Sequence, residues 1–204
     1  MTDSTSHEGA EESRAVKVGV LLDQEPDEIG EWLADMAAFD AAGADALWVD
    51  SGPEPEWDVL ALTAALAVVT FRLRLVLALP DSRAPSAGLA RTLDTIGRLS
   101  HGRLALVADS SRCEELAVVA PRVGIFRRLP GEPGIFEGPG EEDEVERWES
   151  GPAPQGRESW RAACADAAGR GARGLVVPAD PQLLDILRNP DDLGDRRDLQ
   201  IAQG

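Results

Sequence analysis

The sequence is poor in the residues that build most metal and nucleophilic sites. It has no tyrosine, two histidines, two cysteines and a single lysine, Lys17. Cys113 and Cys164 lie far apart with no ligand residues beside them, so neither a disulfide framework nor a metal site is indicated and free thiols are expected. His7 falls in the N-terminal segment and His101 in a predicted turn, which leaves a histidine-centred metal site or catalytic triad without its parts.

Positive charge and long apolar runs are also scarce. The chain has 20 basic and 37 acidic residues, a net charge of -17, and no stripe of Lys and Arg. A nucleic-acid partner needs clustered basic residues, and an anionic membrane repels an acidic surface, so neither partner is expected. The longest uncharged run, residues 59–71, is too short to span a bilayer, and no signal-peptide pattern opens the chain. We therefore expect a soluble, cytoplasmic protein.

The length of 204 residues suits one domain with a substantial core. Residues 1–15 are polar and acidic and are predicted to form a disordered leader. Residues 16–190 are predicted to form a single α/β domain, followed by a charged C-terminal tail at residues 191–204.

Within that domain, short apolar runs alternate with segments of helical spacing. Strands are expected at residues 16–22, 46–49, 73–79, 104–108 and, after a break, 174–178. Helices are expected at about residues 29–43, 58–69, 85–99, 114–119, 157–169 and 181–188. This alternation predicts βαβ units, a parallel sheet and helices on the outside.

The alternation of strand and helix patterns breaks at about residues 122–150. This segment is predicted to form a β excursion with an edge strand at residues 147–149. Five βα units plus this excursion are too few for a complete eight-unit barrel, which takes roughly 250 residues. The predicted fold is therefore an incomplete or modified TIM-type (β/α) barrel with parallel strands and outer helices. Its open strand edge would need a cover: the excursion, a second copy of the chain, or strands from another protein.

Three segments carry a resemblance to a known family. Residues 39–49 are similar to the family motif E-x-A-G-F-D-x-L-W-V, and residues 63–75 to L-A-A-L-A-A-x-T-x-R-I-R-L. Residues 89–104 are similar to A-x-x-x-A-T-L-D-x-L-S-x-G-R, with a fainter similarity at residues 183–204. On these motifs the chain resembles the luciferase-like monooxygenase superfamily of flavin- or deazaflavin-dependent oxidoreductases.

The residues of the third motif also have structural uses. Asp94 and Ser100 can cap or hydrogen-bond turn backbone, Gly102 permits a positive φ, and Arg103 can bind helix carbonyls. The motif is therefore interpreted mainly as a scaffold signature, which indicates ancestry better than catalysis.

The resemblance implies an active site at the carboxyl ends of the strands and FMN or a deazaflavin as cofactor. Residues that follow the second, third and fourth strands are the candidate cofactor-binding residues: Asp50, Ser51, Arg83, Asp109, Ser110 and Ser111. For the Asp and Ser residues the alternative is N-capping of the next helix. No catalytic residue is assigned, and the set is compatible with a small-molecule ligand.

The chain departs from the family after the fourth strand, where relatives have a glycine-rich turn and this chain has Ala108-Asp109-Ser110-Ser111. Asp109 would repel a flavin phosphate unless Arg112 compensates. Two hypotheses stay open. One is a flavin- or deazaflavin-dependent oxidoreductase or monooxygenase of unknown substrate. The other is a catalytically degenerate dimeric relative, without cofactor, that serves binding or assembly.

The helix at residues 57–71 is the predicted homodimer surface. It is apolar all round, which is typical of a helix buried on every side. Relatives dimerise through this part of the barrel, so the resemblance implies the same surface.

Overall fold

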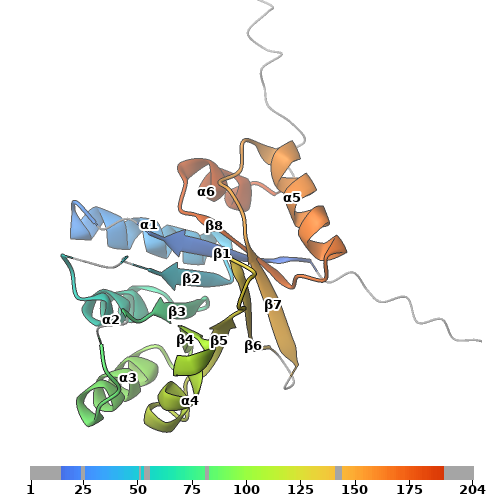
Figure 1. The fold of residues 1–204 in the computed structure, drawn as a ribbon. Helices are drawn as coiled ribbons and strands as arrows, with labels where there is room; N and C mark the ends of the chain where they lie inside the picture. Colours follow the sequence, from blue (N-terminus) through green and yellow to red (C-terminus); the bar gives the residue numbers. More distant parts are fainter. Residues whose placement is uncertain are drawn as a thin grey trace, which may run out of the picture.

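The computed structural model describes residues 15–23, 26–50, 52, 56–80, 83–140 and 144–190. Of the leader predicted at residues 1–15, all but residue 15 lies outside the described residues, as does the whole tail predicted at residues 191–204. Within the described part of the chain, eight strands form one closed barrel in chain order, from β1 round to β8 (Figure 1).

The strands alternate with helices along most of the chain. The strands are β1 (Lys17–Leu22), β2 (Ala46–Val49), β3 (Arg74–Ala78), β4 (Leu104–Asp109), β5 (Gly124–Arg128), β6 (Ile135–Pro139), β7 (Val145–Ser150) and β8 (Gly174–Pro178). The helices are α1 (Ile29–Ala42), α2 (Val59–Val69), α3 (Ala87–Leu99), α4 (Ser110–Val119), α5 (Arg157–Gly169) and α6 (Pro181–Arg188). None of these described helices has the length and apolar character needed to cross a bilayer.

The barrel closes with few residues because one part of it is antiparallel. Strands β1 to β5 pair in parallel, as do β7 with β8 and β8 with β1. Strand β6 runs antiparallel between β5 and β7. Antiparallel neighbours need only a short turn, whereas parallel neighbours need a crossover of a dozen or more residues. The meander β5–β6–β7 therefore replaces helical crossovers and saves chain length.

The predicted modified (β/α) barrel with outer helices is confirmed. Of the covers considered for its open edge, the β excursion is the one in the structure, and the described sheet has no open edge. The edge strand predicted at residues 147–149 is wrong in that respect, because β7 pairs on both sides. The helix predicted at residues 114–119 begins earlier, at Ser110.

Helices line the outside of the parallel part of the barrel. Helix α6 contacts α1, and α1, α2, α3 and α4 contact one another in turn, so they follow round one flank (Figure 1). The outward faces of the strands supply buried aliphatic side chains to this layer, such as Leu47, Leu75, Leu106 and Leu175. Burial of these side chains is the main contribution of this layer to stability.

Aromatic rings fill the interior of the barrel. Trp48 from β2 lies beside Phe126, Phe136 and Trp148, at centroid distances of 5.3, 4.7 and 5.7 Å. Because these side chains come from β2, β5, β6 and β7, they tie the antiparallel meander to the parallel strands. Tilted and edge-to-face ring pairs of this kind add stabilisation beyond the area that they bury.

Inward-facing glycines make room for these rings. A Cβ atom added to Gly174 would lie 2.3 Å from the Trp148 ring, and one added to Gly138 would lie 2.2 Å from the Phe126 ring. Both distances are far shorter than van der Waals contact. A side chain at either glycine is therefore incompatible with the observed ring positions.

Candidate functional site

The carboxyl ends of the parallel strands meet at one end of the barrel, which we call the mouth. Among the described residues, four aspartates follow these strand ends: Asp23 after β1, Asp50 after β2, Asp109 at the end of β4 and Asp180 after β8. In this fold, ligand-binding residues lie at this end of the barrel. The mouth is therefore rich in carboxylates.

Arg128, the last residue of β5, links two of these aspartates. Its Nη2 atom lies 3.4 Å from Oδ2 of Asp50, and its Nη1 atom lies 3.8 Å from Oδ1 of Asp109. The structure thus brings together two predicted site residues through a third that the sequence analysis missed. Phe126 points into the barrel, so the two-residue alternation of a strand also turns Arg128 inward, and a strand predicted to reach residue 128 could have identified it.

Beyond their shared contact with Arg128, the predicted site residues have separate local roles. Asp109 occupies the N-cap position of α4 but makes no capping hydrogen bond, so the capping alternative is wrong for this residue. Ser110 and Ser111 form the exposed first turn of α4. The carboxylate of Asp50 accepts a hydrogen bond from the N–H of Gly52 at 3.2 Å, and Ser51 lies outside the described residues.

The two arginines considered for a cofactor phosphate already have partners. Arg83 donates from Nη2 to the carboxylate of Asp58 at 2.7 Å, and Asp58 is the N-cap of α2. Burial would raise the pKa of Asp58, but hydrogen bonds from Arg83 and from two backbone N–H groups outweigh it and lower the pKa. Arg112 donates to the carbonyl groups of Leu79, Pro80 and Arg83 at 3.2, 3.1 and 2.6 Å, so it holds the loop after β3.

The described mouth residues do not fit the phosphate of a flavin mononucleotide or deazaflavin cofactor. Such a phosphate needs cationic side chains or free backbone N–H groups, as at a helix N-terminus. Here Arg128 is shared between two carboxylates, and the N–H groups at the start of α4 follow the carboxylate of Asp109. The carboxylates of Asp50 and Asp109 would repel a phosphate placed beside them. The arrangement therefore disfavours an anionic ligand.

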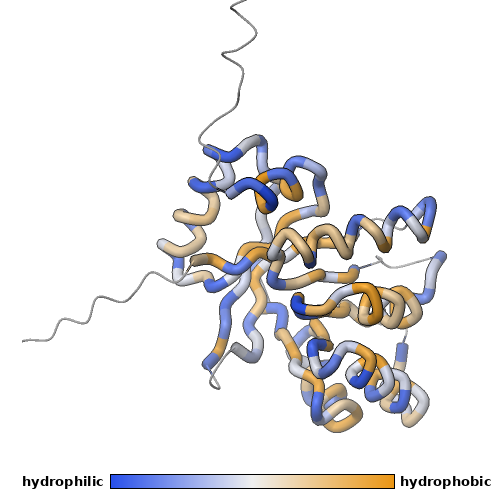
Figure 2. The backbone as a smooth tube through the Cα atoms, turned by 180° about the vertical axis from the view of Figure 1, so that it is seen from behind, coloured by the Kyte–Doolittle hydropathy of each residue, from blue (hydrophilic) through white to orange (hydrophobic). Residues whose placement is uncertain are grey.

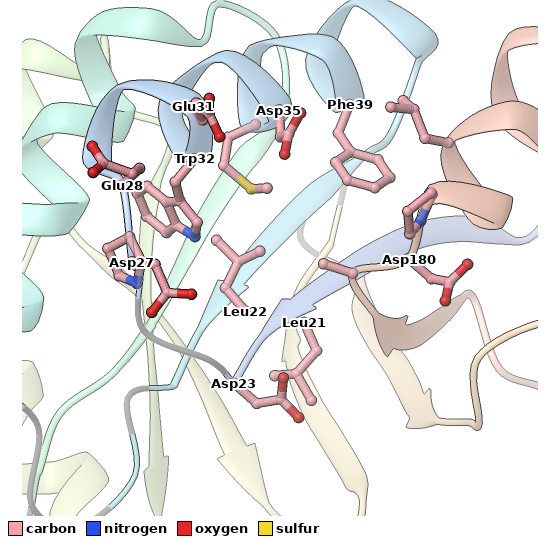
Figure 3. Close-up of a pocket in the computed structure, with 15 residues that line it drawn as sticks. Leu21, Leu22, Asp23, Asp27, Glu28, Glu31, Trp32, Asp35, Phe39 and Asp180 are labelled. Carbon is pink, nitrogen blue, oxygen red and sulfur yellow. The ribbon is translucent and has the colours of Figure 1, made fainter.

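A cavity of about 380 Å³ opens beside the mouth, between α1 and α6, at the ends of β1 and β8 (Figure 3). Its apolar lining includes the buried side chains of Leu22, Met36 and Phe39 and the half-buried ring of Trp32. Six carboxylate side chains complete the lining: Asp23, Asp27, Glu28, Glu31, Asp35 and Asp180. The cavity therefore combines an apolar floor with an acidic rim.

The segments that carry the family resemblance meet at the opposite end of the barrel. Asp40, at the end of α1, is buried and accepts hydrogen bonds from the N–H groups of Phe71, Arg72 and Leu73 at 2.8, 3.0 and 3.0 Å. The side chain of Arg72 donates back to the carbonyl group of Asp40 at 2.6 Å. These hydrogen bonds hold the segments of the first and second motifs together at the end of the barrel opposite the mouth.

The third motif joins the same structure. Arg103 donates to the carbonyl groups of Thr70, Leu73 and Ala67 at 2.7, 2.8 and 3.3 Å, which confirms its predicted role as a ligand of helix carbonyls. Gly102 has the predicted positive φ of 81°. Asp94 is different: it pairs with Arg98 on the surface of α3 at 2.8 Å, and no capping bond of its side chain is seen in the described chain.

The two cysteines lie in different helices, α4 and α5. Cys113 and Cys164 are free and half-buried, and burial raises the pKa of both thiols. Among the described residues, no group of three or more His, Cys, Asp or Glu side chains is arranged to hold a metal ion.

No protein-family model matches the chain, and no curated protein matches it by sequence. Among solved structures, it is similar to a coenzyme F420-dependent tetrahydromethanopterin reductase from Methanopyrus kandleri, with 21% identity and a TM-score of 0.36 over 47% of this chain and 26% of the other. It is also similar to the oxygenating constituent of 3,6-diketocamphane monooxygenase from Pseudomonas putida, a type II Baeyer-Villiger monooxygenase in complex with FMN, with 14% identity, a TM-score of 0.43 and coverage of 79% and 57%.

A third similar structure is tryptophan synthase from M. tuberculosis, with 15% identity, a TM-score of 0.39 and coverage of 86% and 90%. The chain spans about a quarter of the reductase and somewhat more than half of the monooxygenase. Likeness at this level of identity and TM-score says nothing about the activity of the chain.

Proposed function

We propose that this protein is a shortened luciferase-like barrel that serves binding or assembly and performs no flavin chemistry. The observation that carries the proposal is the Asp50–Arg128–Asp109 arrangement. It places two carboxylates and one shared cation at the strand ends, where a phosphate-bearing cofactor would need net positive charge. The motif residues Asp40 and Arg103 support the proposal, because their contacts are with backbone at the other end of the barrel.

A flavin- or deazaflavin-dependent oxidoreductase is the second candidate. The motif resemblance at residues 39–49 and 89–104 favours it. Such a cofactor supplies the redox chemistry itself, so the protein mainly needs to position it. In that case the guanidinium group of Arg128 would bind the phosphate of the cofactor at the mouth.

The two candidates predict different properties of the purified protein. For a binding protein we expect a colourless preparation without a flavin or deazaflavin absorption band. We also expect no change in melting temperature when FMN is added. Flavin retained through purification, even below one equivalent, would favour the oxidoreductase instead.

Assembly as a homodimer through α2 is part of the proposal. Helix α2 has no charged residue, and Figure 2 shows it apolar along its length. Its outer side and flanks expose Trp57, Val68 and Phe71 by 40%, 59% and 76%. Because the chain carries a net charge of -17, most surfaces of two copies would bring carboxylates close to one another. Two α2 faces would bring apolar side chains together instead. A second copy is therefore the partner that best fits this face.

Val68→Asp is expected to convert the dimer to a monomer, because it places a carboxylate in the centre of an apolar contact. Light scattering coupled to size exclusion measures the change. The matched control is Val118→Asp on α4, where the side chain is 83% exposed, and this variant should remain dimeric. A wild-type chain that is monomeric at high micromolar concentration would contradict the proposal.

A further inference from the structure

The cavity between α1 and α6 has a lining suited to one chemical class of ligand. Its floor is aliphatic and aromatic: Leu22 and Met36 are buried there, and the rings of Trp32 and Phe39 face it from α1 (Figure 3). Its volume of about 380 Å³ lies in the range of small-molecule pockets. An apolar body of the size of a substituted benzene fits such a space.

The acidic rim of the cavity favours a positively charged ligand. Glu31 and Asp35 line the cavity from α1, Asp27 lines it from the segment before α1, and Asp23 and Asp180 line it from the ends of β1 and β8 (Figure 3). No basic side chain lines this cavity in the described residues. Carboxylates on two sides of an apolar space attract a cation and repel an anion.

The aromatic lining is an independent indication of a cation. Cations bind favourably over the face of a tryptophan ring, and quaternary ammonium groups are commonly recognised by aromatic side chains. Trp32 supplies such a ring between the apolar floor and the acidic rim. A metal ion is a poorer fit, because no cluster of three ligand side chains among the described residues could hold one.

We infer that this cavity binds a small hydrophobic organic cation, with its apolar body on the floor and its ammonium group between Trp32 and the carboxylates. The inference goes beyond the proposed function, because it assigns a ligand class and a second site that shares only Asp23 and Asp180 with the mouth. It holds whether or not the mouth binds a flavin, so the two conclusions can fail separately.

Benzyltrimethylammonium is the probe, titrated into the full chain by calorimetry at low ionic strength and followed by tryptophan fluorescence. We expect saturable one-to-one binding that weakens as salt is added. Benzyl alcohol and benzenesulfonate, which keep the ring but are neutral and anionic, should bind at least about tenfold more weakly. No saturation by the cation, or equal binding of the sulfonate, would overturn the inference.

Variants locate the site. The double variant Glu31→Gln, Asp35→Asn keeps both side-chain shapes and should weaken binding by about fivefold to tenfold, because two rim charges are lost. Trp32→Leu keeps an apolar side chain and removes the ring, and it should weaken binding by a similar factor. Glu115→Gln, an exposed carboxylate on α4, is the matched control and should bind as the wild type does. Unchanged affinity in the double variant and in Trp32→Leu would place the cation elsewhere and overturn the inference.

Discussion

Asp40→Asn is expected to lower the free energy of unfolding by about 2–3 kcal/mol at neutral pH, which urea denaturation can measure. The carboxylate of Asp40 accepts three backbone N–H groups and is only 5% exposed. An asparagine presents one oxygen and turns its own NH₂ group toward remaining donors, so at least one buried N–H loses its acceptor. The attachment of the loop between α2 and β3 to α1 is then weakened.

The control for this prediction is Asp94→Asn, which removes an exposed carboxylate paired with Arg98 within α3. Such a pair contributes about 0.3–0.5 kcal/mol, so the control should change stability very little. Equal losses in the free energy of unfolding would show that the N–H contacts of Asp40 contribute no more to stability than an exposed ion pair does.

The effect of Asp40→Asn should also depend on pH. Burial alone raises the pKa of Asp40, but the N–H groups of Leu73, Phe71 and Arg72 and the charge of Arg72 outweigh it, and the pKa lies below the ordinary 3.8. A carboxyl group with a lowered folded-state pKa stabilises the fold above its unfolded pKa and loses that contribution as pH falls through the folded pKa. The difference between wild type and variant should therefore be constant near neutral pH and shrink below about pH 3.8.

Gly174→Ala is the second substitution with a large expected effect, a loss of about 3 kcal/mol or more. The added Cβ would lie 2.3 Å from the Trp148 ring inside the closed barrel, where the ring is buried, so the strand or the ring must shift. Thermal and urea unfolding measure the loss.

The matched control is Gly30→Ala in α1, where a Cβ meets no atom within 4 Å. Alanine there should stabilise the protein by about 0.5–1 kcal/mol, because it reduces the flexibility of the unfolded chain and favours helix. In a double-mutant cycle, Trp148→Leu should relieve part of the cost of Gly174→Ala. Additive effects would mean that the ring does not pack against this glycine.

The parallel part of the fold could be predicted because its signals are local. The apolar run at residues 46–49 coincides with β2, and Asp58 caps α2 where the sequence placed the helix start. Helix α4 was predicted too short because Ser110, Ser111 and Arg112 show no apolar periodicity, although they form its first turn.

The closure of the barrel and the composition of the mouth were harder to predict, because both depend on distant pairings. The register that places Arg128 opposite Asp109 requires β4 and β5 to be aligned, and nothing local in the sequence specifies this alignment. Asp40 binds N–H groups that lie more than thirty positions later, so its role could not be read from its own motif. The cavity beside the mouth combines side chains from both ends of the chain.

We propose that the Asp50–Arg128–Asp109 arrangement makes the mouth unsuited to a flavin phosphate. Calorimetric titration of the full chain with FMN at low ionic strength tests this claim most directly, because low salt exposes any electrostatic attraction. The predicted result is no saturable heat up to high micromolar FMN. Stoichiometric binding of FMN with a micromolar or tighter Kd would contradict the claim.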